Sequence, residues 1–352
     1  MKKFLLSFLA ALWLCSGFAQ SVHGKVVVEH INAKTLQNSG GENPVRRVTV
    51  YLPPGYDSSG ARYPVIYYLH GFLWSDSLLV AADHIDRALD KAIADGRIRP
   101  VIVVMPNENT VYGGSFYTNS SLTGRWADFT AKELVQYVDA HYRTVADRNS
   151  RGISGHSMGG HGAIKLGMLY PDVFSCVYAL SPAVLGFANE LSPDREGFRS
   201  VLPLRSKEEL TNGRNFLANV VVALGRAYSP DPAKPPFYCD LPFSYRGDSV
   251  LTDAKTLELW KQNTPFYMID RYADNLRKLR ALKLDWGRND EFTHIPPTCL
   301  EFSRKLEKLG IRHYAEEYIG THGSKIMSED GRLLNELLPF FNATLDFPAR
   351  SK

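Results

Sequence analysis

The segment Gly155-His156-Ser157-Met158-Gly159 places a serine between two glycines with the spacing Gly-x-Ser-x-Gly. It lies between a strand-like stretch and a helical stretch of small residues, so the serine is predicted to occupy a tight strand-to-helix turn. Glycines let neighbouring backbone approach such a turn, and the first amides of the following helix face developing negative charge. Ser157 is therefore predicted to be a nucleophile for acyl transfer.

A serine hydroxyl is a weak nucleophile without a base, and the sequence offers several histidines for that role. His322 lies in Gly-Thr-His-Gly, just after the strand-like stretch 313–318, which is the expected place for the base. The competing histidines fit this role less well: His156 and His161 flank the serine, His294 precedes two prolines and His313 begins a strand. His322 is the predicted base.

The base needs a carboxylate to fix its tautomer and to stabilise the imidazolium. Asp290 follows the strand-like stretch 282–286 in a turn and is the predicted acid, with Asp285 and Glu291 as competing assignments. The order serine, acid, histidine along the chain is the one expected of α/β-hydrolases.

Acyl transfer also creates an oxyanion that needs two positioned donors. The backbone amide of Met158, directly after the nucleophile, is the first predicted donor. The second is the amide of Phe72 in Leu-His-Gly-Phe after an early buried strand, with Gly71 as the competing assignment. His70 is predicted to brace this loop rather than to take part in the chemistry.

Strand-like and helix-like patterns alternate along the chain, which predicts a mainly parallel central sheet with helices on both faces. Two β-branched stretches, 25–30 and 47–52, are predicted to pair antiparallel at a sheet edge. Strands buried on both faces are predicted at 65–69 and 101–105, and further strands at 151–154, 173–180, 282–286 and 313–318. The predicted helices are 80–94, 126–142, 158–170, 207–217, 251–262, 298–309 and 325–341. Ligands collect at the carboxyl ends of such strands.

The regular alternation breaks between about residues 184 and 280. The stretch 229–248 carries five prolines there. This pattern predicts an insertion before the acid-bearing strand, inside a single domain spanning 20–352. Its helical pieces are too short to fold alone and are expected to pack over the main sheet.

Several of these motifs together resemble the esterase D family of α/β-hydrolases. They are Leu-His-Gly-Phe, the stretch 126–143 leading to Gly-His-Ser-Met-Gly-Gly-His-Gly-Ala-Ile, the acid that ends Gly-x-x-Asp, and Gly-Thr-His-Gly. The resemblance spans about 45–341 and is weaker at 184–280. It implies an α/β-hydrolase fold and the same assignments of Ser157, Asp290, His322, Phe72 and Met158. The family includes S-formylglutathione hydrolases, mycolyltransferases, siderophore esterases, and feruloyl and acetyl esterases of plant polysaccharides.

Residues that contact the substrate are expected in the loops at the strand ends, and these loops are rich in aromatic side chains. The candidates for stacking on a phenolic acyl group or a sugar ring are Trp74, Phe116, Tyr117 and Trp126. Tyr112 and the aromatic residues of the insertion, Phe237, Tyr238, Phe243 and Tyr245, are further candidates. Ordinary packing is the alternative explanation for each of them.

Residues 1–19 have the pattern of a secretory signal. Lys2 and Lys3 precede an apolar run at 4–14, and small residues at 17 and 19 precede a cut before Gln20. The mature protein is expected to be secreted or periplasmic. Leu14 directly before Cys15 disfavours a lipid anchor, and no other apolar run reaches the roughly 18 residues of a membrane span.

The composition narrows the class of protein further. With 352 residues, 44% of them hydrophobic, the chain can bury a large core. The formal net charge of +4, half of it from Lys2 and Lys3, gives no basic stripe for nucleic acid. Cys176, Cys239 and Cys299 allow at most one disulfide. No metal-ligand spacing occurs among the ten histidines, so no metal or cofactor is predicted.

The sequence therefore predicts an exported serine ester hydrolase that removes feruloyl or acetyl groups from carbohydrate, a small-molecule or polysaccharide ester being its partner. Export argues against S-formylglutathione, a cytosolic substrate. The alternatives are an acyltransferase using the same triad with a sugar or lipid acceptor, and a non-catalytic binding protein on a hydrolase fold. A peptidase of the prolyl-oligopeptidase type fits poorly because the chain is too short to carry a propeller. The sequence does not indicate an oligomeric state.

Overall fold

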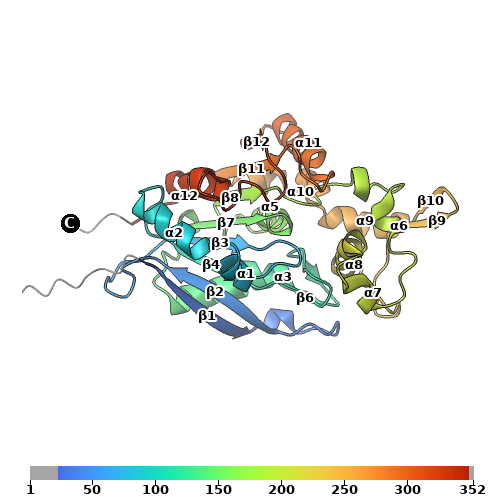
Figure 1. Ribbon diagram of the computed structural model, residues 1–352, viewed down its shortest axis with the longest axis horizontal. Helices are drawn as coiled ribbons and strands as arrows, with labels where there is room; N and C mark the ends of the chain where they lie inside the picture. The colour runs from blue at the N-terminus through green and yellow to red at the C-terminus, as the bar shows by residue number, and fades with distance from the viewer. Residues whose placement is uncertain (1–22, 349–352) are drawn as a thin grey trace, which may run out of the picture.

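The chain forms an eight-stranded sheet in a computed structural model that describes residues 23–348 (Figure 1). The predicted signal segment 1–19 and Cys15 lie outside the described residues. The strands in spatial order are β1 Lys25–Asn32, β2 Val45–Leu52, β4 Ile102–Pro106, β3 Val65–Leu69, β7 Arg151–His156, β8 Cys176–Leu180, β11 Ala281–Gly287 and β12 Tyr314–Tyr318. The two smaller sheets are β5 Asn119–Ser120 with β6 Gly124–Arg125, and β9 Phe243–Arg246 with β10 Ser249–Thr252.

β1 and β2 run antiparallel at one edge of the sheet, as the sequence predicts. The other six strands of this sheet, β4, β3, β7, β8, β11 and β12, are parallel to one another. The helices are α1 Asp76–Ala81, α2 Ile85–Ala94, α3 Trp126–Asp128, α4 Leu134–His141, α5 Met158–Leu169, α6 Glu196–Arg199, α7 Lys207–Thr211, α8 Phe216–Tyr228, α9 Ala254–Asn263, α10 Pro265–Arg277, α11 Ile295–Lys308 and α12 Leu338–Thr344. The remaining helical turns, which are not α-helical, are η1 Lys34–Leu36, η2 Phe129–Glu133, η3 Arg148–Ser150, η4 Asn189–Leu191 and η5 Leu333–Leu337.

The sheet separates two hydrophobic clusters because side chains alternate along each strand. In β3, Val65, Tyr67 and Leu69 face the cluster under α5, while Ile66 and Tyr68 face the cluster under α2 and α12. Every residue of β3, β4 and β8 is buried, as expected of parallel strands covered on both faces. The predicted mainly parallel sheet with helices on both faces is confirmed.

Three predicted helices differ from the observed ones. The predicted helix 80–94 is broken at His84, whose φ of 51° lies in the left-handed region. The predicted helix 207–217 is interrupted before α8, where Gly213 has a φ of 82° that favours glycine. The predicted helix 325–341 becomes helical only at η5, because Lys325 has a φ of 57° and the chain turns at Gly331.

The segment 184–280 connects β8 to β11, which are neighbours in the sheet. α6, α7, α8 and α9 lie together at one end of the molecule, whereas α10 lies beside α5 (Figure 1). α10 packs along α5, and Asn275 donates a hydrogen bond of 2.8 Å to the Met168 carbonyl. The buried Lys165 of α5 donates to the Asn263 carbonyl at 2.9 Å. The segment therefore joins the core on the face that α5 covers.

No helix within residues 23–348 is long and apolar enough to cross a bilayer.

His161 links α5 to this segment through a buried imidazole. Its Nδ1 donates to the carbonyls of Ala183 and Val184 at 3.1 and 3.2 Å, and its Nε2 accepts from the Tyr228 hydroxyl at 3.2 Å. Burial, with a smaller effect from the charge of Lys165, lowers the pKa of His161 from 6.5 to about 3. The folded protein therefore keeps this ring neutral.

We predict a pH-dependent difference in stability between the wild type and His161→Gln. Between pH 6.5 and about 3 the unfolded chain binds a proton at His161 that the folded chain excludes, so acidification destabilises the wild type. Denaturant unfolding at several pH values measures this. The stability advantage of the wild type should shrink by about 1.4 kcal/mol per pH unit. Parallel pH profiles for the two proteins would contradict the assignment.

Candidate active site

Ser157 occupies the turn between β7 and α5 in a strained backbone conformation. Its φ is 60° and its ψ is −118°, values that non-glycine residues rarely adopt. Three backbone hydrogen bonds hold it: its amide donates to Leu180, and its carbonyl accepts from His161 and Ala183, at 3.0 to 3.1 Å. The strain is therefore balanced by contacts to the adjacent strand and the loop that follows it.

The glycines of the motif are required by backbone that passes very close to the turn. A Cβ at Gly155 would lie 2.5 Å from the Leu69 carbonyl oxygen, and one at Gly159 would lie 2.0 Å from the same atom. A Cβ at Gly160 would lie 2.8 Å from the Leu180 carbonyl. The turn thus rests directly on the carboxyl ends of β3 and β8.

His322 is held by Asp290 through a hydrogen bond of 2.8 Å from Nδ1 to Oδ2. The Asp290 side chain has no exposed surface, and its Oδ1 accepts from the Phe292 amide at 2.9 Å. A carboxylate only accepts hydrogen bonds, so the imidazole carries its proton on Nδ1 and leaves the Nε2 lone pair available.

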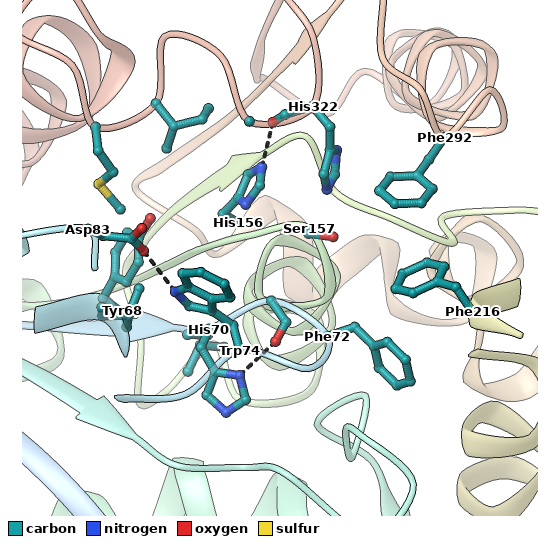
Figure 2. A pocket seen from close by; sticks show the side chains of 16 residues that line it. Tyr68, His70, Phe72, Trp74, Asp83, His156, Ser157, Phe216, Phe292 and His322 are labelled. Atoms are coloured by element: carbon teal, nitrogen blue, oxygen red, sulfur yellow. Dashed lines mark hydrogen bonds between the residues drawn. The ribbon is translucent and has the colours of Figure 1, made fainter. Parts of the chain in front are cut away.

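The backbone around His322 is also fixed by two neighbours. Glu291 accepts from the His322 amide at 2.9 Å, a contact that lowers the pKa of Glu291. His156 donates from Nε2 to the His322 carbonyl at 2.8 Å (Figure 2). Burial first, and the nearby His322 second, lower the pKa of His156 to about 3, so this ring is a neutral brace.

Of the three acids considered from the sequence, the structure brings only Asp290 to the His322 ring. Asp285 instead binds the Tyr178 hydroxyl at 2.5 Å and Arg332 at 2.7 Å. Burial raises the pKa of Asp285 to about 6, and the Arg332 charge opposes that shift. Asp285 therefore ties β8 and β11 to the C-terminal segment, and Glu291 holds backbone.

Ser157 and His322 line one cavity, and Figure 2 shows the imidazole beside the serine side chain. Among the described residues, no hydrogen bond joins the Ser157 hydroxyl to His322. Such contacts are often long in proteins without substrate and tighten in the complex.

The loop after β3 lies against the nucleophile. A Cβ at Gly71 would lie 3.5 Å from Ser157 Cβ. His70 braces the loop, since Nδ1 donates to the Gly71 carbonyl and Nε2 accepts from the Glu108 amide, both at 2.8 Å. Burial lowers the pKa of His70 to about 4, which keeps it neutral and able to make both bonds.

The predicted oxyanion donors lie at this loop and at the start of α5. Within residues 23–348, the amides of Phe72 and Met158 donate to no protein acceptor, and the same holds for Gly71. The next two amides are occupied, Leu73 by the Gly113 carbonyl at 2.9 Å and Trp74 by the Gly71 carbonyl at 3.1 Å. Free amides beside Ser157 suit a developing oxyanion.

Two cavities meet at Ser157. The wide cavity, about 330 Å³, is lined by His322, Trp74, Tyr68, Asp83 and the 323–327 segment, among others. The narrow cavity, about 20 Å³, is lined by Phe116, Met158, Val184, Leu191, Leu217, Val220 and His294, among others. Phe72, Phe216 and Phe292 border both cavities.

The four predicted substrate contacts have different positions. Trp74 lines the wide cavity and Phe116 the narrow one. Tyr117 and Trp126 line neither, and both are fully buried. The Tyr117 hydroxyl donates to the His70 carbonyl at 2.8 Å, and the Trp126 indole donates to Thr123 at 3.3 Å. The prediction of substrate contact is wrong for Tyr117 and Trp126, whose rings pack the core beneath the loops.

Sequence reasoning missed Phe216 and Phe292. Their rings form a continuous row with Phe72 and His322: Phe72 to Phe216 at 5.7 Å, Phe216 to Phe292 at 5.2 Å and Phe292 to His322 at 4.7 Å between centroids (Figure 2). Phe216 is the first residue of α8, so segment 184–280 contributes directly to the site. The position of Phe292, two residues after the acid, was the available signal.

The same segment also binds the loop that carries the acid. Glu190 accepts from His294 Nδ1 at 2.7 Å, and His294 Nε2 accepts from the Val184 amide at 3.1 Å. Burial opposes ionisation of Glu190, but the contacts with His294 and Thr293 outweigh it and lower its pKa to about 2. The start of the segment is thus fixed beside Asp290.

The Esterase family model matches residues 41–327, a span that includes the serine turn, Asp290 and His322. The chain belongs to the Esterase family. The resemblance to esterase D proteins is thereby confirmed. Among the residues described, no group of three or more histidine, cysteine or acidic side chains could hold a metal ion, and the cysteines at 176, 239 and 299 are unpaired.

Curated relatives of this Esterase family member match it over part of their length. Esterase MT1326 of Mycobacterium tuberculosis is 35% identical over 145 residues, which is 38% of this chain and 28% of that protein. An endo-1,4-beta-xylanase/feruloyl esterase of Xylanibacter ruminicola is 32% identical over 142 residues, 37% of this chain and 18% of that protein. The chain therefore spans less than a third of either relative.

Solved structures match nearly the whole chain. A ferulic acid esterase superposes with a TM-score of 0.63 at 22% identity, covering 92% of this chain and 98% of the other. An S-formylglutathione hydrolase from Agrobacterium tumefaciens gives 0.61 at 17% identity, covering 94% and 99%. The predicted α/β-hydrolase fold is confirmed.

We predict that Gly159→Ala damages both stability and activity. The added Cβ would overlap the Leu69 carbonyl, which is backbone and cannot move aside cheaply. The free energy of unfolding should fall by about 1 to 3 kcal/mol, and ester hydrolysis should fall as the turn shifts. Gly60→Ala is the matched control, because a Cβ there meets nothing within 4 Å. Equal effects of the two substitutions would show that the turn is not tightly packed.

Proposed function

We propose that the protein is a serine carboxylic ester hydrolase with Ser157 as nucleophile, His322 as general base and Asp290 as the acid that orients it. The observation that carries this proposal is the 2.8 Å hydrogen bond between His322 Nδ1 and a fully buried Asp290, beside the strained Ser157 turn. The bond directs the basic Nε2 into the cavity that Ser157 shares.

In the first half-reaction, Ser157 Oγ bonds to the ester carbonyl carbon while its proton moves to His322 Nε2. The carbonyl oxygen becomes an oxyanion that the amides of Phe72 and Met158 stabilise. When the carbonyl re-forms, the bond to the alcohol oxygen breaks and that oxygen takes the proton from His322. The products are a free alcohol and an acyl group on Ser157.

In the second half-reaction, water enters the place of the alcohol and gives a proton to His322 Nε2 as its oxygen bonds to the acyl carbon. The bond to Ser157 Oγ then breaks, and Oγ regains its proton from His322. The carboxylic acid leaves and the enzyme is restored. Asp290 stays ionised throughout and stabilises the imidazolium in both steps.

We further propose that the ester is a feruloyl or acetyl decoration of carbohydrate, and that the enzyme is exported. The substrate class is supported by a relative whose name includes feruloyl esterase, by the similar structure of a ferulic acid esterase and by the indole of Trp74 in the wide cavity. Export is supported by the signal-like pattern of residues 1–19.

Ser157→Ala should reduce kcat for p-nitrophenyl acetate by about 10⁴-fold or more, because the covalent step is lost. The measurement uses residues 20–352, with thermal unfolding of the variant as the control for folding. A folded variant that retains most of the wild-type activity would refute the proposed nucleophile.

Comparing Asp290→Asn with Asp285→Asn should distinguish the carboxylate that orients His322 from the carboxylate that stabilises the fold. Asparagine at 290 no longer fixes the His322 tautomer, so kcat should fall by about 10³- to 10⁴-fold with little change in KM. Asparagine at 285 disturbs the contacts with Tyr178 and Arg332, so its main effect should be a lower thermal midpoint. A larger loss of kcat in folded Asp285→Asn would reassign the acid.

A further inference from the structure

The two cavities at Ser157 differ in their access to the base. His322 and Gly323 line the wide cavity, whereas the narrow cavity contains Ser157 and Met158 but not His322. In the proposed reaction the alcohol oxygen must take its proton from His322, so the alcohol has to lie on the side of the base. The acyl chain then extends toward the narrow cavity.

The narrow cavity has room for very little. Its volume is about 20 Å³, and one water-sized group needs roughly 10 to 15 Å³ on the same measure. Val184, Leu191 and Val220 are buried residues of its lining, and Phe116 and Met158 line it as well. Such a space fits the methyl group of an acetyl ester and excludes a longer chain or an aromatic ring.

The wide cavity has a polar end suited to hydroxyl groups. Asp83 is half-buried and accepts from the Trp74 indole at 2.8 Å, which leaves further lone pairs available. The Tyr68 hydroxyl is buried and has no hydrogen-bond partner among the described residues. Figure 2 shows these three side chains together, on the other side of Ser157 from Phe72 and Phe216.

An unpartnered phenol, a carboxylate and an indole face are the groups that recognise a sugar: the phenol donates, the carboxylate accepts from hydroxyls, and the indole packs on the apolar ring face. Burial also raises the pKa of Asp83, and the hydrogen bond from Trp74 offsets only part of that shift. A buried polar atom without a partner costs free energy, which a bound hydroxyl would recover.

We propose that the enzyme removes acetyl groups from a polyhydroxylated alcohol such as a sugar, with the acetyl methyl in the narrow cavity and the alcohol in the wide cavity. This inference rests on the proposed ester hydrolysis and selects acetyl over feruloyl. Val220 and Leu191 limit the acyl chain, while Asp83 and Tyr68 select the alcohol.

The acyl half is tested with p-nitrophenyl acetate, p-nitrophenyl butyrate and methyl ferulate. For the wild type, kcat/KM should be at least tenfold higher for acetate than for butyrate, with methyl ferulate lower still. Val220→Ala should raise the butyrate-to-acetate ratio about tenfold. Val221→Ala is the matched control: the same change in the same helix, also buried, at a residue that does not line the narrow cavity.

The alcohol half is tested with Asp83→Asn on an acetylated methyl xyloside and on p-nitrophenyl acetate. Asparagine still accepts from Trp74 but recognises hydroxyl groups less strongly than a carboxylate. The variant should lower the ratio of kcat/KM for the xyloside to that for p-nitrophenyl acetate by about tenfold, mainly through KM. Asp95→Asn, a surface change at the end of α2, is the control.

The outcomes are distinguishable. Preference for butyrate or methyl ferulate, or an unchanged ratio in folded Val220→Ala, would overturn the acyl assignment. An equal loss on both acetates in Asp83→Asn would overturn the alcohol assignment. If Val220→Ala does not fold, Leu217→Ala, at a half-buried residue that lines the same cavity, replaces it. Absence of Ser157-dependent turnover on every ester would instead refute the proposed function.

Discussion

Backbone contact at the serine turn is the constraint on which the rest of the site depends. The Leu69 carbonyl lies so near Gly155 and Gly159 that neither position tolerates a side chain. The contact lies where β3 and β7 pair, next to Ser157, whose φ of 60° is held by its own backbone hydrogen bonds. The loop after β3 and the start of α5 then reach the same point with free amides. The same backbone packing therefore positions both the Ser157 hydroxyl and the amides predicted to bind the oxyanion.

Neutral histidines stabilise the surroundings of this arrangement. His70 and His156 each bond to a loop carbonyl, and burial keeps their pKa values far below the ordinary one. A neutral ring can donate with one nitrogen and accept with the other, which a lysine or a carboxylate cannot do. The sequence separated His322 from them by its position after the strand-like stretch 313–318. That His156 is a neutral brace follows only from its burial and its bond to the His322 carbonyl.

Local patterns predicted the elements that carry the chemistry. Continuous apolar runs gave β3 with its observed bounds, and the glycine spacing placed Ser157 at the β7–α5 turn. The errors have two sources: residues 325–331 form turns in which Ile326 and Met327 line the wide cavity, and Trp126 fills the core. Phe216 was missed because no local pattern indicates that a helix starting 59 residues after Ser157 contributes a ring to the site, where it packs on Phe72.

Segment 184–280 can vary in length with little effect on the serine turn, because of where its ends lie. Its two ends join β8 and β11, which are adjacent, so the chain leaves and re-enters the sheet at nearly the same place. Closing a longer or shorter excursion between such points changes the loop entropy only slowly. The helices of the segment pack into the core, so length changes are best tolerated in its exposed turns, and changes near α8 alter Phe216 and the walls of the narrow cavity. A change of length in this one excursion therefore reshapes the cavities at Ser157, while the serine turn keeps its contacts with β3 and β8.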